Sequence, residues 1–149
     1  MTSDGGAGPR TGRIVVGVDG SPSSAAALRW AAKQAHLTGA EIHAIMTWEL
    51  PTAYSWAPVV QKPDYADECE TFLAQTVKDA LGDVAAHQVR WEALPGHPAW
   101  RLIEAADGAD LLVVGSRGHG GFAGLLLGSV SQHVVAHAPC PVVVVHGDL

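Results

Sequence analysis

One stretch of the sequence places glycine residues where a loop could bind an anion. The apolar run 111–114 ends at Gly115, Gly118 follows after two residues, and Gly128 follows after nine more. Glycine has no Cβ and tolerates positive φ, so the main-chain N–H groups of such a loop can come close to a phosphate. A helix predicted to begin at Gly128 adds unpaired N–H donors and the positive end of its dipole. The pattern therefore indicates a ligand that carries a phosphate chain.

Polar residues around these glycines could take part in the same site. Ser129 can cap the predicted helix or donate to a phosphate oxygen, and Ser131 adds a second hydroxyl. Arg117 is the nearest cation, and it could pair with a phosphate in a bidentate manner or simply be a solvated loop charge. His119 is expected to face solvent rather than to act as a base. The glycines themselves could instead serve strand exit and close helix packing.

A second loop with site chemistry follows the first apolar run, at Gly17–Ser21. The carboxylate of Asp19 could accept hydrogen bonds from a ribose hydroxyl or an adenine amino group, or it could bond its own main chain in a turn. Ligands of open parallel sheets bind beyond the carboxyl ends of the strands, where the strand order reverses. If both loops line one crevice, the first and fourth strands are neighbours, which predicts the strand order 3-2-1-4-5.

Apolar runs alternate with helix-like segments along the chain. Ser21 followed by Pro22 predicts a helix start, and Gly39 and Gly82 predict helix ends. The apolar runs are too hydrophobic to face water on either side, so we predict an α/β fold with a five-stranded parallel sheet covered by helices on both faces. The strands are expected at 13–18, 41–48, 88–93, 110–114 and 141–145, and the helices at 22–38, 65–81, 98–107 and 128–136.

Composition narrows the classes of function. The net charge of −6, without a basic stripe, argues against a nucleic-acid partner. Apolar stretches are too short for a membrane span, and the two cysteines form no disulfide framework, which suits a reducing cytoplasm. We expect residues 1–12 to be a disordered tail and residues 13–149 to be a single domain.

Several commoner motifs do not fit the sequence. A Walker P-loop needs a lysine, and none lies near the glycines. Residues 118–123 match the dinucleotide pattern G-x-G-x-x-A, but they follow the fourth strand and no acidic residue lies about 20 positions further on. His133 and His137 have the spacing of a zinc helix, but a third ligand is not evident. We therefore assign no catalytic or metal-binding residue.

The motifs together resemble a known family. The spacing Gly115-x2-Gly118-x9-Gly128-Ser129 is similar to the signature of the ATP-binding branch of single-domain universal stress proteins. Residues 14–21 resemble the opening strand of that family, and residues 138–145 resemble its closing strand. The resemblance implies a Rossmann-like fold, a homodimer, and binding of ATP with slow or no hydrolysis. We expect the ATP to be bound together with Mg2+.

The resemblance also implies roles for individual residues. Asp19 would meet adenine or ribose, and Thr47 would contact adenine through its main chain. With the loop residues discussed above, the predicted binding set is Gly17, Asp19, Thr47, Gly115, Arg117, Gly118, Gly128, Ser129, Val130 and Ser131. The long loop 49–64, with Tyr54 and Trp56 and with Trp48 before it, departs from the family, and it could either flank the site or only pack against the protein.

Three alternatives to an ATP-binding module stay open at this stage. The same pocket could hold cAMP instead of ATP. An ATP-hydrolysing enzyme of the α-hydrolase type shares the fold, but it would carry S-G-G-x-D-S where this chain has residues 19–24, DGSPSS. A nucleotide-free adaptor would lack the glycine signature, which this chain has.

The final strand bears on the oligomeric state. In the order 3-2-1-4-5 it lies at an edge of the sheet, and Val142–Val145 are four consecutive valines. An exposed apolar edge is prone to aggregation, so we expect it to pair with the same strand of a second copy across a two-fold axis. Alternatively, the C-terminal residues or helices could cover it. The sequence does not identify a protein partner.

Overall fold

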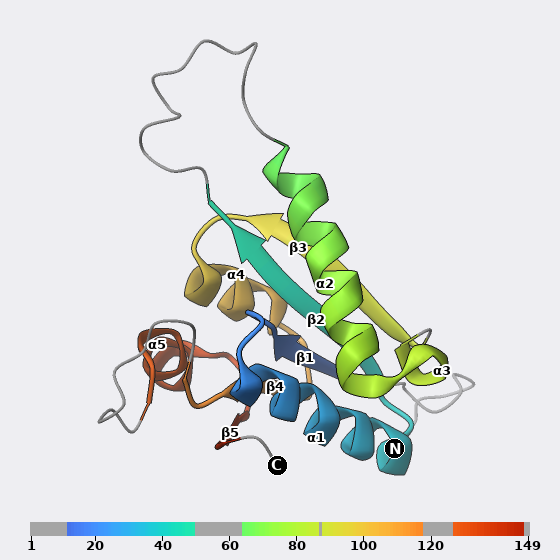
Figure 1. Ribbon diagram of the computed structural model, residues 1–149. Coiled ribbons are helices and arrows are strands. Elements are labelled where there is room, and N and C mark those ends of the chain that lie inside the picture. The colour runs from blue at the N-terminus through green and yellow to red at the C-terminus, as the bar shows by residue number, and fades with distance from the viewer. Residues whose placement is uncertain (1–11, 50–63, 87, 118–126, 148–149) are drawn as a thin grey trace, which may run out of the picture.

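The fold is a five-stranded parallel sheet with helices on both faces (Figure 1). The computed structural model describes residues 12–49, 64–86, 88–117 and 127–147. The strand order is β3-β2-β1-β4-β5, which confirms the predicted order. The strands are β1 (Arg13–Gly17), β2 (Glu41–Trp48), β3 (Val89–Pro95), β4 (Leu111–Gly115) and β5 (Val142–Val145).

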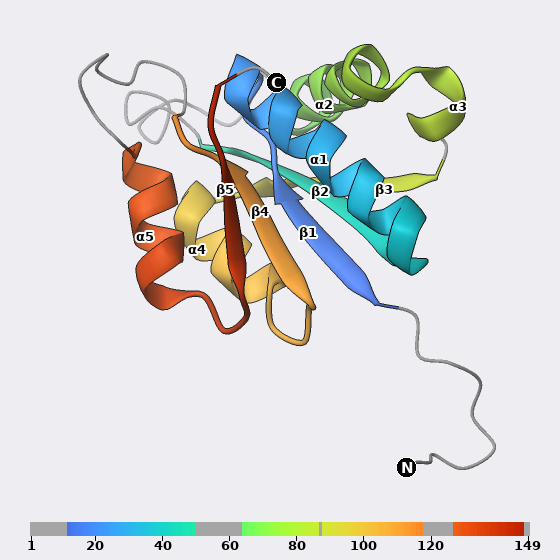
Figure 2. The same cartoon turned by 90° about the horizontal axis from the view of Figure 1, so that it is seen from below.

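Helices cover the sheet in two layers, as Figure 2 shows. On one face lie α1 (Pro22–Thr38) and α2 (Tyr65–Leu81), followed by the single turn α3 (Asp83–Ala86). On the other face lie α4 (Pro98–Ala105) and α5 (Ser129–His137). Each layer has its own apolar core against the sheet, because successive strand residues point to opposite faces.

Local sequence signals explain where α1 begins and ends. The Ser21 side chain caps the helix by accepting a hydrogen bond from the N–H of Ser24 at 3.2 Å, and Pro22 occupies the first helical position. Gly39 ends it in the left-handed conformation, with φ of 77°. These signals fixed the predicted range 22–38, and the observed bounds are the same.

Some predicted bounds differ from the structure. The third strand extends to Pro95 rather than ending at 93, because its residues stay paired with the long strand β2 up to Trp48. The third helix ends at Ala105 rather than at 107. The short helix α3 was not predicted, since four residues are too few to show a helical period. The predicted tail, residues 1–12, falls almost wholly outside the described residues, as does the loop with Tyr54 and Trp56.

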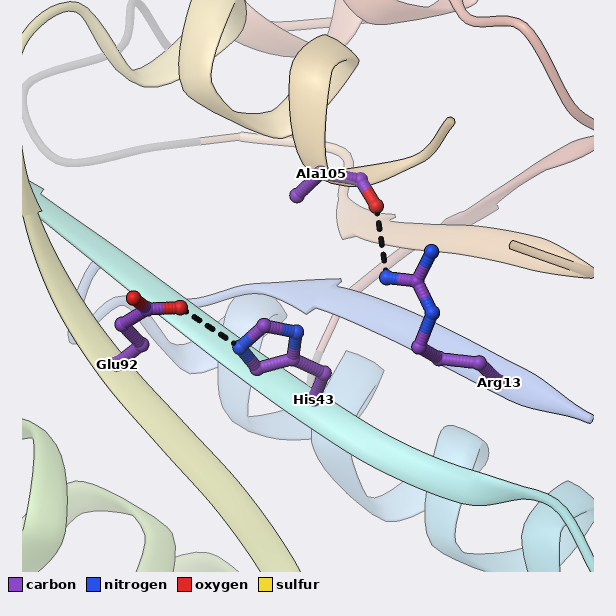
Figure 3. A network of polar contacts seen from close by, with 4 residues as sticks. All are labelled: Arg13, His43, Glu92 and Ala105. Atoms are coloured by element: carbon purple, nitrogen blue, oxygen red, sulfur yellow. Dashed lines mark hydrogen bonds and ion pairs between the residues drawn. The ribbon is translucent and has the colours of Figure 1, made fainter. Parts of the chain in front are cut away.

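Polar contacts hold the end of the sheet opposite the predicted site (Figure 3). The Arg13 guanidinium donates to the carbonyl oxygens of Ala105 and Asp107, both at 2.8 Å. These carbonyls lie at the end of α4, where a helix leaves its last acceptors unpaired and its dipole is negative. Nearby, His43 Nε2 and Glu92 Oε1 are 3.0 Å apart and join β2 to β3. The amino end of β1 is thus tied to the end of α4, and β2 is tied to β3, by side chains that take no part in the predicted site.

Within the described residues, no helix is long and apolar enough to cross a membrane. The two cysteines are free and partly buried, and burial raises the pKa of both the Cys69 and the Cys140 thiols. At neutral pH both are therefore neutral thiols rather than reactive thiolates.

The core predicts a clear contrast between two adjacent residues of α2. Leu73 is fully buried between α2 and the sheet, whereas Phe72 is 52% exposed. We expect Leu73→Ala to lower the free energy of unfolding by about 2–5 kcal/mol, because it removes buried contacts and leaves a cavity. Phe72→Ala, the matched control, should cost about 1 kcal/mol or less. Chemical denaturation measures both, and equal losses would contradict the packing described here.

Candidate functional site

The two predicted loops begin at the point in the sheet where the strand order reverses. The central strand β1 has β2 on one side and β4 on the other. The connections from β1 to β2 and from β3 to β4 therefore lead to opposite sides of β1, which makes its carboxyl end the switch point of the sheet. The register aligns Val16 with Val113, so Gly115 lies level with Val18. The loop that carries Asp19 and the loop that leaves Gly115 thus start side by side.

Gly115 lets the first turn of α1 pack directly on the end of β4. A Cβ at this position would contact the Ser23 hydroxyl and would lie 2.6 Å from Ser23 C and 2.8 Å from Ser24 N. Those are backbone atoms, which have no freedom to move away. The requirement for glycine here is therefore one of close packing, the alternative that the sequence had left open. A contact between Gly115 and a nucleotide stays a prediction.

Two serines at the start of α1, the N-cap Ser21 and the helical Ser23, hold the main chain of the glycine loop. The hydroxyls of Ser21 and Ser23 donate to the carbonyl oxygen of Arg117, at 3.2 and 2.6 Å. The N–H of Arg117 lies 3.3 Å from the Ser23 hydroxyl oxygen and donates to it. Both serines are buried, whereas the Arg117 residue is exposed. The main chain of Arg117 is thus anchored while its side chain stays on the surface.

The start of α5 offers main-chain donors without a capping side chain. Gly128 is the N-cap, and its N–H donates to the Ser116 carbonyl at 2.6 Å, which joins the two ends of the loop. Because glycine has no side chain to cap with, the first N–H groups of the helix, those of Ser129, Val130 and Ser131, have neither an intrahelical acceptor nor a cap. This is the arrangement in which a helix N-terminus binds an anion.

The two serines of this helix differ from each other. Ser129 is the first helical residue rather than the N-cap, so the predicted capping role is wrong and its exposed hydroxyl is left toward solvent. Ser131 is only 3% exposed, and its hydroxyl donates to the Gly115 carbonyl at 2.5 Å. That bond uses the only hydroxyl proton of Ser131. Its part in an anion site therefore falls to its main-chain N–H.

Asp19 forms the turn that was one of the two roles considered for it. Its Oδ1 accepts a hydrogen bond from the N–H of Ser21 at 2.9 Å, which forms the expected Asp turn, and Gly20 takes φ of 83° within it. The turn engages one carboxylate oxygen of an exposed residue. A carboxylate has a second oxygen, so the turn is compatible with an acceptor role toward a ligand.

Thr47 presents its main chain past the end of β1. The N–H of Val18 donates to the Ile45 carbonyl at 2.9 Å, so the backbone groups of Ile45 face β1. Alternation along β2 then turns the Thr47 backbone to the same side, two residues beyond the last β1–β2 pair, Gly17 and Ile45. Asp19 lies two residues beyond the same pair on β1. Thr47 and Asp19 therefore occupy matching positions at the carboxyl ends of the neighbouring strands β2 and β1.

Of the other glycines in the predicted binding set, Gly17 lies within the described residues and Gly118 does not. Gly17 packs under α4, because a Cβ there would lie 2.7 Å from Leu102 Cδ1. Gly118 and His119 lie outside the described residues.

The two histidines with zinc-helix spacing lie close together on α5. The rings of His133 and His137 are 5.0 Å apart. In the described part of the chain, no group of three or more His, Cys, Asp or Glu residues could hold a metal ion.

The sequence predicted Ser21 as a helix cap, but it did not predict that Ser21 and Ser23 bond the Arg117 carbonyl or that the Cys69 thiol lies near Thr47. Ser23 reaches a carbonyl 94 positions away in the sequence, and local spacing carries no sign of that contact. The Cys69 Sγ lies 3.9 Å from the Thr47 carbonyl oxygen, a weak contact near the carboxyl end of β2. Only the short polar residues clustered at 21–24 could have drawn attention to this region.

The strand order, together with the glycine loop that leads from β4 into α5 at the switch point, defines a Rossmann-like α/β protein. The family model described as "Universal stress protein family" matches residues 11–146, and the chain belongs to this family. Universal stress protein Rv1996 of Mycobacterium tuberculosis is 39% identical over 140 residues, which cover 88% of this chain and 43% of that protein. A universal stress protein of Mycolicibacterium smegmatis is 39% identical over 142 residues, which cover 91% of this chain and 48% of that protein. This chain spans about half the length of the curated relatives it matches.

Solved structures of the family share the fold. A universal stress protein from Lactobacillus plantarum is 25% identical and superposes with a TM-score of 0.65 over 93% of this chain and 99% of that one. A universal stress protein crystallised in complex with cAMP is 29% identical, with a TM-score of 0.61 over 91% of this chain and 96% of that one.

The different environments of Ser131 and Ser129 lead to a paired prediction. Ser131→Ala leaves the buried Gly115 carbonyl without its donor, so we expect the free energy of unfolding to fall by about 1–3 kcal/mol. Ser129→Ala removes an exposed hydroxyl and should change stability by about 0.5 kcal/mol or less. Thermal and chemical unfolding of the two variants test this, and a Ser131→Ala protein as stable as the wild type would show that the bond contributes nothing.

Proposed function

We propose that this chain binds ATP, with Mg2+, in the crevice between the ends of β1 and β4, and that it acts as a nucleotide-dependent module of the stress response. The observation that carries the proposal is the N-terminus of α5, where Gly128 leaves the first-turn N–H groups uncapped beside the Asp19 loop. In this proposal the phosphates lie on those N–H groups, and Asp19 and Thr47 meet the nucleoside end. The two free thiols suit a cytoplasmic setting.

Main-chain dipoles are the suitable donors in this protein. The chain carries a net charge of −6, so the overall field repels an anion and binding depends on local donors. Gly118, Ser129 and the Arg117 side chain would complete the phosphate end. No residue in the proposed site is assigned as a general base, so we infer slow or no hydrolysis. Rapid turnover by pure protein that is lost in Asp19→Ala would instead favour an ATPase.

A second candidate ligand is cAMP. The observation that favours it is the relative, 29% identical to this chain, whose solved structure contains cAMP. Both nucleotides share adenine and ribose, so they would use the same nucleoside end of the crevice. They differ in their phosphate groups, so a difference between the affinities for ATP and cAMP would come from contacts at the phosphate end.

Gly128→Glu tests the anion site directly. The new carboxylate would stand at the N-cap of α5, where we place the phosphates, and unit charges of like sign 4 Å apart repel by roughly 4 kcal/mol at an effective dielectric constant of 20. We expect ATP affinity to fall by at least about a hundredfold while the protein stays folded, as measured by calorimetry and circular dichroism.

Ala136→Glu is the matched control for this variant. It adds the same charge at an exposed position near the other end of α5, and ATP affinity should be retained. Unchanged ATP affinity in a folded Gly128→Glu protein would contradict the site. Titration of cAMP into the wild type decides between the two ligands, since the natural ligand should bind more tightly.

We also propose that the chain forms a homodimer through β5. This strand pairs only with β4 in the described sheet, so its other edge is open. The Ser116 N–H donates to the Val145 carbonyl, which shows that Val143 and Val145 face β4. Alternation then turns the backbone groups of Val142 and Val144 to the open edge, where an antiparallel copy of β5 would find them.

Val144→Pro is the variant that tests the dimer. Proline removes an N–H that faces the open edge and spares the bonds to β4, so we expect a dimeric wild type and a monomeric, folded variant in analytical ultracentrifugation. Val144→Thr keeps the N–H and a β-branched side chain, and it should remain dimeric. A wild-type chain that sediments as a monomer at micromolar concentration would rule the arrangement out.

A further inference from the structure

A buried donor without a partner lies at the carboxyl end of β2. Among the residues that the structure describes, the indole Nε1 of Trp48 is the one buried side-chain nitrogen or oxygen atom that lacks a hydrogen-bond partner. An indole N–H can only donate, and folded proteins leave few buried donors unsatisfied. The described residues leave this donor unsatisfied, so it is free to bond an acceptor that they do not supply.

The position of Trp48 connects it with the nucleotide site. It follows Thr47, whose backbone faces the crevice beyond the end of β1. The carbonyl of Trp48 accepts from the Gly96 N–H at 2.9 Å, so the main chain of this residue is held against β3. Alternation along β2 places its side chain on the same face as Ala44 and Met46, which pack in the core that α1 and α2 cover. The indole is thus carried by a fixed strand end beside the crevice.

We propose that the Trp48 indole N–H is a recognition donor of the nucleotide site and that it bonds an acceptor on the nucleoside half of the ligand. The inference rests on the proposed function and adds a specificity residue to it. Adenine ring nitrogens and ribose oxygens are both acceptors, and they belong to the half of the ligand that the Thr47 side of the crevice would hold. The phosphates belong to the opposite side, at α5.

Trp48→Phe removes the donor and keeps an aromatic ring. We expect ATP and adenosine to bind about three- to tenfold more weakly, by the same factor for both, because one hydrogen bond to the nucleoside is lost. The ligand-free variant should unfold at a temperature no lower than that of the wild type, since it no longer buries an unpaired donor. The control is Trp100→Phe on α4, where the side chain is 56% exposed, and it should leave both affinities unchanged.

A second measurement uses the wild-type chain, so it does not depend on the variant folding. In a 1H–15N spectrum of the indole groups, the Trp48 resonance should move downfield and exchange more slowly with solvent when adenosine is added. Unchanged affinities in Trp48→Phe together with an unmoved resonance would overturn the inference while leaving ATP binding intact. A loss for ATP alone would place the contact at the phosphates and also overturn it. Failure of the wild type to bind ATP at all would instead refute the proposed function.

Discussion

The architecture of the site depends on how closely α1 approaches the end of β4. Gly115 permits that approach, because any side chain there would run into the backbone of Ser23 and Ser24. At this separation the hydroxyls of Ser21 and Ser23 reach the Arg117 carbonyl. These bonds fix the direction in which the chain leaves β4, and the bond between Gly128 and Ser116 fixes where it returns. The position of the α5 N-terminus follows from both.

Serine is well suited to this arrangement. Its short hydroxyl satisfies buried backbone groups without adding charge, which matters in a chain whose net charge is already −6. Ser21, Ser23 and Ser131 are used in this way and are nearly inaccessible. Among the described residues, the main-chain N–H groups at the start of α5, the exposed hydroxyl of Ser129 and the exposed Arg117 side chain remain as donors for a ligand. The buried serine hydroxyls therefore hold the main chain of the site in place, while main-chain N–H groups and exposed side chains would contact the ligand.

The sequence predicted the strand order, and it placed the bounds of the predicted strands and helices to within two residues, because local signals mark where these elements begin and end. Ser21 and Pro22 marked the start of α1, and the chemistry of two loops placed β1 beside β4. It did not predict that Gly128 rather than Ser129 is the N-cap, since either residue suits that position. Nor did it predict the bond from Ser23 to Arg117, or the unpaired indole of Trp48. Those depend on tertiary proximity, which spacing along the chain does not encode.

Two separate features of the fold would recognise the two halves of a nucleotide. One is the extra length of β2, which runs on past the β1 pair at Gly17 and Ile45 and so leaves the Thr47 backbone and the Trp48 indole beyond the end of β1. The other is the uncapped start of α5. ATP and cAMP share their nucleoside half, so the end of β2 would treat them alike. Selection between them must then come from the phosphate half, where the number of negative charges differs. In the proposed site Arg117 would lie at that phosphate half. Its main chain is anchored by Ser23 and its side chain is exposed, so among the described residues it is a cation that would contribute to the distinction.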